Sequence, residues 1–316
     1  MRAIFMGTPE FAVPCLQTVA QEHELLGVVT QPDSRQGRGH KLCFSPVKLQ
    51  ALSYNVPILQ PIKLREAITV NTIKDLQPEV IIVVAYGQKI PKILLELPAK
   101  GCINVHSSLL PKYRGAAPIQ YAILKGEKET GVSTMYLSQQ WDAGDIILQD
   151  KEVIYPDDTA GSLHDRLSLR GACLLSQTLK QLSAGVAPRI PQNHEAATYA
   201  FKLTKEQGAI DWTKTADELQ DFVRGMNPWP TAYTYYNEET IKLWETEILR
   251  SESSKNGHPG EIVNINDHGI CIATGSNGTI IVKQLQRRGS RKLSGKDFAN
   301  GLRLKIGDRL GKVDSK

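Results

Sequence analysis

The sequence has little cysteine and no metal-binding pattern. Its five cysteines are scattered over 316 residues, and neither a CxxC pair nor an HExxH run occurs. Their spacing favours neither a disulfide framework nor a zinc site, so we expect no metal. No apolar run approaches the ~20 residues of a membrane helix, and Met1–Gly7 has the pattern of a strand instead of a signal peptide. We therefore expect a cytoplasmic protein with no membrane contact, and nothing in the sequence demands more than a monomer.

The start of the chain also lacks the glycines of a dinucleotide-binding fold. Arg2–Met6 predicts a buried strand, and the turn after it predicts a helix with Thr8 as the N-cap and Pro9 in the first turn. This turn has one glycine, whereas the G-x-G-x-x-G spacing is needed for the backbone to approach a pyrophosphate. The sequence therefore disfavours a nicotinamide or flavin enzyme.

Positive charge is concentrated in two stretches. The formal net charge is only +5, but residues 280–316 contain 11 Lys and Arg against 3 Asp and Glu. The stretch Gln31–Lys48 carries four basic residues against Asp33 alone, and its first part, to Lys41, is polar, glycine-rich and without period. A loop of this length in a compact α/β domain is either disordered or functional. Basic patches indicate either nucleic-acid contact or solvated surface, and charge alone does not decide between them.

Two patterns of secondary structure follow one another along the chain. Continuous apolar strands such as Val80–Ala85 alternate with helices, which predicts a parallel sheet covered on both faces. Thr130–Leu137 and Asp145–Ile154 predict a strand pair, and Thr159–Leu182 predicts a helix that closes the first domain. A second domain begins with a helix at Thr215–Met226, for which Thr215 is the expected N-cap. Short strands separated by turn residues then predict a small barrel or sandwich: Ala232–Tyr236, Ile241–Leu249, Gly260–Ile265, Ile270–Thr274 and Thr279–Leu285.

The most informative stretch is Gly101–Gln120. Asn104 and His106 lie two residues apart on a predicted strand, so their side chains project from the same face. An amide donor beside an imidazole suits a reaction at a carbonyl, because one group stabilises an oxyanion while the other moves a proton. Asp142, in the turn between two strands, could orient the imidazole as a third member. The structural alternatives are a histidine bonded to the backbone and an aspartate in a surface turn, and spacing alone cannot join Asp142 to His106.

These residues carry a resemblance to a known family. The run Asn104–Pro118 (NVHSSLLPKYRGAAP) resembles the signature of the folate-dependent formyltransferases, and Asp142–Asp145 (DAGD) is similar to their second motif. Further stretches are similar to the members of that family that act on methionyl-tRNA: Met6–Phe11, Gln31–Asp33 with Gly37–Gly39, Val84–Gly87, Ile210–Trp212 and Asn227–Pro230. The resemblance covers nearly the whole chain, although the end of the tail carries little that matches.

The resemblance implies both an architecture and a reaction. It implies an α/β fold with a Rossmann-like parallel-sheet formyltransferase domain at residues 1–188 and a linker at 189–206. Residues 207–316 would form a C-terminal OB-like β-barrel that binds tRNA. The donor would be 10-formyltetrahydrofolate. The acceptor would be the α-amine of methionine on initiator methionyl-tRNA, for translation initiation, with no DNA partner.

The resemblance also implies roles for single residues. Asn104, His106 and Asp142 would be catalytic, and Ser108, Leu109, Leu110 and Pro111 would line the folate site. The loop around Arg38 would reach the acceptor end of the tRNA. By their charge, further residues are candidates for phosphate contacts: Lys41, in the same loop, and Lys283, Arg287 and Arg288 of the basic tail.

Two other functions remain open at this point. A formyltransferase with the same catalytic set could act on a small amine, such as glycinamide ribonucleotide or an amino sugar, without a basic acceptor-stem loop. A non-catalytic RNA-binding protein on an enzyme scaffold is disfavoured by the intact Asn104, His106 and Asp142 set. Formyl transfer to charged initiator tRNA, compared with transfer to small amines, discriminates these alternatives.

Overall fold

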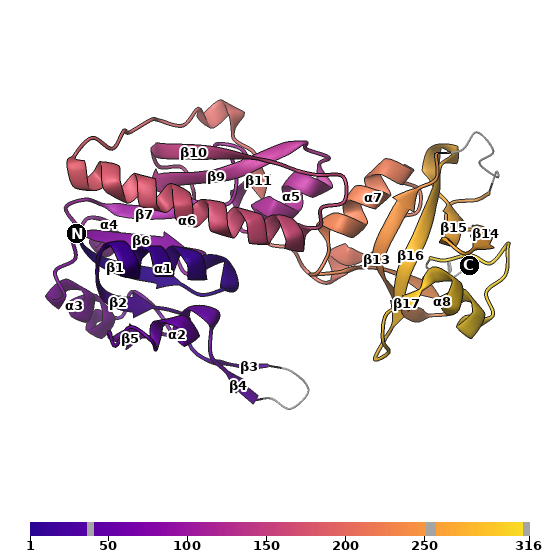
Figure 1. Ribbon diagram of the computed structural model, residues 1–316, viewed down its shortest axis with the longest axis horizontal. Helices are drawn as coiled ribbons and strands as arrows, with labels where there is room; N and C mark the ends of the chain where they lie inside the picture. Colours follow the sequence, from indigo (N-terminus) through magenta and orange to yellow (C-terminus); the bar gives the residue numbers. More distant parts are fainter. Residues whose placement is uncertain (37–40, 251–256, 312–316) are drawn as a thin grey trace. The chain divides into compact units, whose positions relative to one another are not determined.

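The computed structural model describes residues 1–36, 41–250 and 257–311. The chain divides into two compact units, and each unit is made of three separate stretches of the sequence (Figure 1). The first unit comprises Met1–Pro118, Glu129–Val153 and His164–Ala200. The second comprises Ile119–Lys128, Ile154–Leu163 and Phe201–Lys316.

A seven-stranded sheet forms the centre of the first unit, in the order β10-β9-β7-β6-β1-β2-β5. The neighbours from β5 to β7 are parallel, whereas β9 runs antiparallel to both β7 and β10. This arrangement confirms the predicted parallel sheet with a strand pair at its edge. The strands are β1 (Arg2–Gly7), β2 (Glu24–Val29), β5 (Ile58–Leu59), β6 (Val80–Val84), β7 (Cys102–His106), β9 (Glu129–Tyr136) and β10 (Ile146–Val153).

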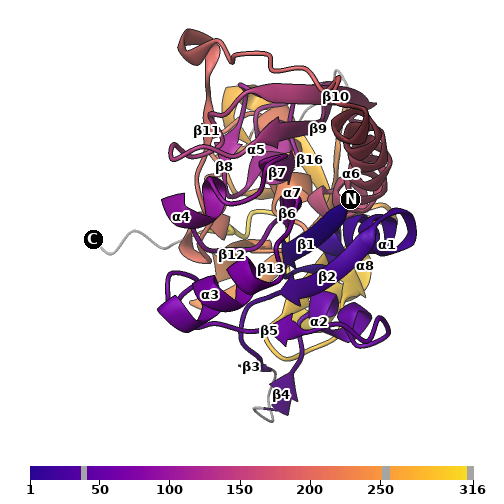
Figure 2. The same cartoon turned by 90° about the vertical axis from the view of Figure 1, so that its left-hand side faces the viewer.

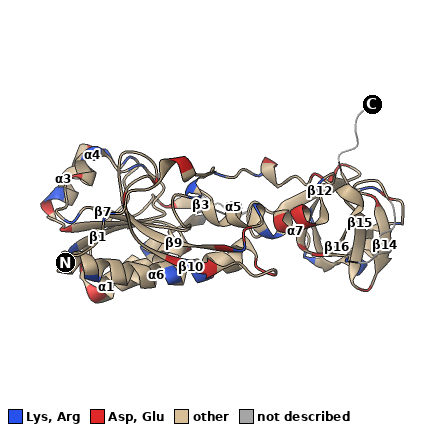
Figure 3. Cartoon of the chain, turned by 90° about the horizontal axis from the view of Figure 1, so that it is seen from above, with Lys and Arg blue, Asp and Glu red and all other residues tan. Residues whose placement is uncertain are grey.

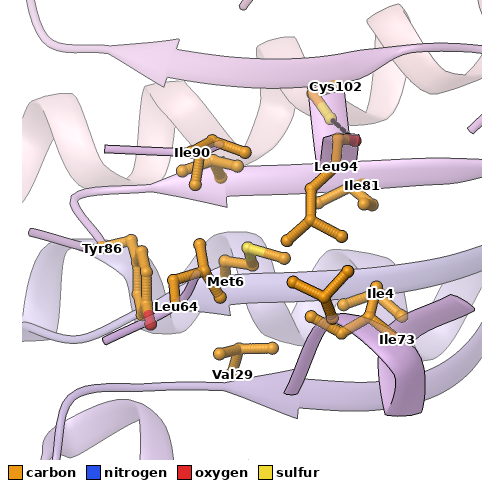
Figure 4. Packing of buried hydrophobic residues seen from close by; sticks show 12 residues of the cluster. Ile4, Met6, Val29, Leu64, Ile73, Ile81, Tyr86, Ile90, Leu94 and Cys102 are labelled. Carbon is orange, nitrogen blue, oxygen red and sulfur yellow. Dashed lines mark hydrogen bonds between the residues drawn. The ribbon is translucent and has the colours of Figure 1, made fainter. Parts of the chain in front are cut away.

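Helices cover both faces of this sheet, as the continuous apolar strands require. Figure 2 shows α3 (Ala67–Asp75) and α4 (Lys92–Leu95) on one side of the sheet, and α1 (Val13–Glu22) and α6 (Ala160–Ala184) on the other. On the α3 and α4 side, Ile73 and Leu94 pack with Met6 and Cys102 in one buried cluster (Figure 4). Because strand side chains alternate, Asn104 and His106 face the same side as Cys102, further along β7.

The start of α1 differs from the prediction. A short 3-10 helix, η1 (Glu10–Ala12), precedes α1, and its N-cap is Pro9 with no side-chain hydrogen bond. The Thr8 hydroxyl donates instead to the carbonyl oxygen of Tyr86, at 3.0 Å. The prediction of Thr8 as the N-cap is therefore wrong, because the helical turn begins one residue later and the Thr8 hydroxyl oxygen accepts instead from the backbone N–H of Gln31, at 3.4 Å. The Ser45 side chain does cap α2 (Pro46–Ala51), by accepting from the backbone N–H of Lys48.

The stretch expected to be a loop contains two short strands. β3 (Ser34–Gln36) and β4 (Lys41–Cys43) pair antiparallel, with Ser34 opposite Cys43. The base of this hairpin is held by Asp33, whose carboxylate accepts from Lys48 Nζ at 2.5 Å and from Gln60 Nε2 at 2.8 Å. Backbone pairing and this polar anchor replace the apolar alternation on which strand prediction depends.

The second unit is built on an antiparallel, barrel-like sheet in the order β12-β13-β16-β15-β14, with β17 (Leu293–Ser294) added to β16. It confirms the predicted barrel-like domain. The Thr215 cap of α7 (Ala216–Gly225) is also confirmed, because its hydroxyl and the Glu218 carboxylate form a reciprocal capping box. The five main strands are β12 (Ala232–Tyr236), β13 (Glu239–Ile248), β14 (Ile262–Asn266), β15 (Gly269–Ala273) and β16 (Thr279–Arg287).

The remaining elements are short. β8 (Arg114–Gly115) and β11 (Tyr199–Ala200) form a two-stranded parallel pair in the first unit. The other elements are α5 (Pro118–Leu124), η2 (His194–Ala196), η3 (Glu206–Gly208), η4 (Gly275–Asn277) and α8 (Gly295–Leu302). In the described ranges, no helix combines the length and the apolar character that a membrane crossing requires.

Candidate active site

Asn104 and His106 lie on β7, at the sheet edge where the parallel strands end. Asn104 pairs with Val83 of β6 and Met135 of β9, so the middle of the strand is fixed from both sides. Asn104 is 8% exposed and His106 is 6% exposed. Open α/β sheets bind ligands outside the carboxyl ends of their strands, which is where these two side chains lie.

The imidazole of His106 is oriented by the backbone. Its Nε2 lies 2.9 Å from the carbonyl oxygen of Tyr113. Because a carbonyl oxygen only accepts hydrogen bonds, Nε2 is the donor, and Nδ1 is the nitrogen left for chemistry. The alternative of a histidine bonded to the backbone is therefore realised, but it leaves the other ring nitrogen facing a carboxylate.

That carboxylate belongs to Asp142. Its Oδ2 lies 3.9 Å from His106 Nδ1 and accepts a hydrogen bond of 2.8 Å from the backbone N–H of Gly115. The distance to the imidazole is longer than a hydrogen bond but within the range of an ion pair. Asp142 is only 9% exposed, so the interpretation of a surface-turn aspartate is wrong.

The path of the loop between β9 and β10 explains why sequence spacing could not place Asp142. β9 ends at Tyr136, which pairs with Ile103, so the loop must turn back towards the end of β7. Asp142 adopts a left-handed conformation with φ of 48° in this turn. Gly144 passes so close to β9 that a Cβ atom there would lie 1.8 Å from the carbonyl oxygen of Tyr136. The approach is therefore possible only for glycine at this position.

Three further residues support the site, and the sequence analysis did not select them. Thr198 accepts from the backbone N–H of Tyr113 at 2.8 Å, through its hydroxyl oxygen. The buried guanidinium of Arg114 donates to Gln192 Oε1, and Gln192 Nε2 donates to the carbonyl oxygen of Asp142 at 2.9 Å. Arg114 lies inside the signature run, but Gln192 and Thr198 lie in a stretch with no periodic pattern and gave no signal.

The predicted folate-site residues form a tightly held loop after β7. Ser108 is fully buried, and its hydroxyl donates to the carbonyl oxygen of Lys112 at 2.6 Å. The backbone of Leu110 donates to Ser133 and accepts from Gln149. Leu109 and Pro111 are partly buried beside them. The Ser108 hydroxyl therefore shapes this loop and is closed to solvent.

The predicted tRNA-contacting residues of the second unit differ in whether they form ion pairs with glutamates. Lys283 lies 3.4 Å from Glu245 and 3.0 Å from Glu247, and Glu247 holds the pKa of Lys283 above its usual value. Arg287 forms two hydrogen bonds of 2.8 Å with Glu239. Arg288 is exposed, and no ion pair of its side chain is found within the described residues.

The other two predicted tRNA contacts lie at the β3–β4 hairpin. Lys41 begins β4, although its side chain is not described, and Arg38 lies outside the described residues. Across residues 1–36, 41–250 and 257–311, no group of three or more His, Cys, Asp or Glu side chains is placed to hold a metal ion.

The His106 imidazole and the Asp142 carboxylate lie together towards the carboxyl end of the parallel sheet, on the same side of β7 as the Asn104 amide. An amide, an imidazole and a carboxylate are groups suited to chemistry at a carbonyl group, on the α/β fold of an enzyme. A family model described as formyl transferase matches residues 1–179. The model described as formyl transferase, C-terminal domain, matches residues 202–303. The chain belongs to the formyl transferase family.

Relatives resemble the chain over nearly its whole length. The methionyl-tRNA formyltransferase of Alkaliphilus oremlandii is 46% identical over 312 residues, which are 98% of this chain and 100% of the relative. The methionyl-tRNA formyltransferase of Bacillus subtilis is 43% identical over 311 residues, 98% of each chain. A solved N-formyltransferase from Helicobacter canadensis, in complex with folinic acid and dTDP-3-aminofucose, matches with a TM-score of 0.68 at 18% identity. It covers 90% of this chain and 98% of its own, and it supports the fold alone.

Proposed function

We propose that the chain transfers the formyl group of 10-formyltetrahydrofolate to the α-amine of methionine on initiator methionyl-tRNA, for translation initiation. The observation that carries this proposal is 46% identity to a methionyl-tRNA formyltransferase over 98% of this chain and all of the relative. The similarity therefore extends through both the catalytic unit and the barrel-like unit. Formyltransferases of this family use the folate as donor, so the folate is a co-substrate of the reaction.

The site supports a direct transfer between two amines. The neutral methionyl amine attacks the formyl carbon, and the carbonyl oxygen becomes an oxyanion in a tetrahedral intermediate. Asn104 donates to that oxygen, together with His106, while the Asp142 carboxylate stabilises positive charge on the imidazole and assists removal of the amine proton. The carbon–nitrogen bond to the folate then breaks, and the leaving nitrogen takes up a proton.

The proposal assigns separate tasks to separate parts of the chain. Residues 1–188 form the catalytic domain, 189–206 the linker and 207–316 the tRNA-binding domain. Ser108–Pro111 shapes the folate site, and the phosphate contacts come from the β3–β4 hairpin with Arg38 and Lys41, and from Lys283, Arg287 and Arg288. We place the enzyme in the cytoplasm, as a monomer that does not bind DNA.

A substrate comparison tests this function. Purified enzyme and 10-formyltetrahydrofolate are incubated separately with charged initiator tRNA, charged elongator methionyl-tRNA, glycinamide ribonucleotide and a nucleotide-linked amino sugar. Formylation of the initiator tRNA at a kcat/KM far above the others is expected. Preferential formylation of a small amine would overturn the assignment of the acceptor, and no folate-dependent turnover on any amine would overturn the enzymatic function.

A further inference from the structure

The segment from residue 190 to residue 200, here called the return segment, is part of the first unit, although the sequence places it in the expected linker. It starts with a bridge between Ile190 and Ile146, and it ends in β11, which pairs with β8. The backbone N–H of Arg114 donates to the carbonyl oxygen of Thr198 at 2.8 Å. The return segment therefore runs beside both pieces of chain that form the site, namely the run after β7 and the loop between β9 and β10.

Gln192 is the residue of the return segment that joins these two pieces. Its side chain is 6% exposed and both ends of its amide are used. Oε1 accepts from Arg114 Nη2 at 2.7 Å and from Nε at 3.1 Å. Nε2 donates to the carbonyl oxygens of Asp142 at 2.9 Å and Gly144 at 2.7 Å. A primary amide is suited to this place because it offers an acceptor and two donors in one small group.

The two ends of this bridge lead to the two reacting side chains. Arg114 directly follows Tyr113, the residue whose carbonyl oxygen orients the imidazole of His106. The backbone carbonyl oxygen of Asp142 accepts from Gln192, so the residue that carries the carboxylate is itself held. The Gln192 amide thus sets the position of the Asp142 backbone relative to the segment that holds His106. None of the contacts brings Gln192 to the reacting atoms.

We propose that Gln192 is a positioning residue for formyl transfer, which acts by holding the Asp142 carboxylate at its place beside His106. This inference rests on the proposed function. A misplacement of about 1 Å in a catalytic group can cost on the order of a hundredfold in rate. Loss of the bridge should therefore lower kcat. The KM values for the folate and the tRNA should stay unchanged, because other residues bind these substrates.

Two substitutions separate positioning from simple stability. Gln192→Met keeps the length of the side chain and removes every hydrogen bond. Gln192→Glu keeps an acceptor for the Arg114 guanidinium, so we expect the variant to fold. It also sets a carboxylate oxygen against the carbonyl oxygens of Asp142 and Gly144, and this repulsion should push the loop away. We expect both variants to lose on the order of a hundredfold in kcat with KM values within about twofold of wild type. The control is Gln17→Met, because Gln17 of α1 makes a similar amide hydrogen bond, of 3.0 Å, to Gln50 of α2.

A double-mutant cycle identifies the residue through which Gln192 acts. Single-turnover formylation of initiator methionyl-tRNA is measured for Gln192→Met alone and combined with Asp142→Ala or Asn104→Ala. If Gln192 acts through Asp142, its substitution changes the rate of the Asp142→Ala enzyme by less than about threefold but keeps its full effect on the Asn104→Ala enzyme. Gln17→Met should have no effect in any background.

Each outcome decides the proposal. Equal rate losses in the Asp142→Ala and wild-type backgrounds would overturn it, and so would Gln192→Glu that folds as wild type and keeps its kcat. A wild-type enzyme that does not formylate the charged tRNA would instead overturn the proposed function. The two failures are therefore distinguishable in one set of reactions.

Discussion

His106 is held on one side by a backbone carbonyl and faces a carboxylate on the other. The Tyr113 carbonyl fixes Nε2 as a donor, so the ring cannot turn to offer this nitrogen to a substrate without losing a buried hydrogen bond. Nδ1 and the Asp142 carboxylate then share the remaining space, 3.9 Å apart. This separation is longer than a hydrogen bond, so the two atoms are not hydrogen-bonded to each other.

A second histidine, His23, gives a prediction about stability and pH. Burial of the ring, with the N-terminal ammonium near it, lowers the pKa of His23 in the folded protein. The unfolded state therefore binds more protons, and the free energy of unfolding falls as the pH drops through the unfolded pKa of about 6.5. Urea unfolding at pH 7.5 and 5.5 should show a smaller pH difference for His23→Gln than for wild type. His258→Gln, which alters an exposed ring, is the control, and an unchanged difference in His23→Gln would contradict the assignment.

At the scale of elements, the loop between β9 and β10 carries the carboxylate of Asp142, for which we propose a catalytic role. The prediction concerns Gly144→Ala, because the added methyl group would lie 1.8 Å from the Tyr136 carbonyl oxygen and the loop would have to move. We expect a loss in kcat on the order of a hundredfold, since Asp142 is two residues away. Gly301→Ala in α8 is the matched control, because a methyl group there meets nothing within 4 Å. Wild-type turnover by Gly144→Ala would show that the loop does not need this close approach.

The elements that could be predicted are those whose residues reveal burial directly. The buried run of β6 and the two-residue spacing of Asn104 and His106 follow from strand geometry alone. The Thr215 cap was predictable because capping is local. The β3–β4 hairpin was not, because its pairing depends on backbone contacts and on the distant anchors Lys48 and Gln60.

The contacts between distant segments were the part that the sequence could not supply. Asp142 was a candidate from its motif, but its approach to His106 depends on the reversal of a loop and on the Gln192 amide. Gln192 lies in a stretch without period, so no local pattern distinguishes it from a solvent-exposed glutamine. Its importance follows from burial and from its four hydrogen bonds with Arg114, Asp142 and Gly144, which only the folded chain brings together.

At the scale of the whole molecule, many charges are neutralised by neighbours. Figure 3 shows basic and acidic residues adjacent along α6 and β10. There, Arg170 pairs with Asp150 at 2.7 Å and also with Glu152, and Arg166 pairs with Glu152 at 3.2 Å. Lys283 and Arg287 are paired in the same way with Glu247 and Glu239. The count of basic residues therefore overstates the charge that is available to a polyanion.

This pairing yields a prediction for tRNA binding. Arg288, which has no ion pair among the described residues, should contribute more to phosphate binding than Arg287. Each phosphate contact contributes roughly 0.9 to the slope of log affinity against log salt on duplex DNA, so Arg288→Gln should flatten the slope by about 1. Filter binding of initiator tRNA over a salt series measures this slope, with Lys151→Gln as the control because Lys151 pairs with Glu129. A slope unchanged in Arg288→Gln would remove this residue from the phosphate contacts.

The central claim is that Asn104, His106 and Asp142 act together on one formyl group. Its most direct test is single-turnover transfer from 10-formyltetrahydrofolate to initiator methionyl-tRNA by Asn104→Ala and Asp142→Ala enzymes that unfold at the wild-type temperature. Loss of one oxyanion donor typically costs on the order of a hundred- to a thousandfold, and each variant should lose at least a hundredfold. Near-normal rates in either folded variant would contradict the account.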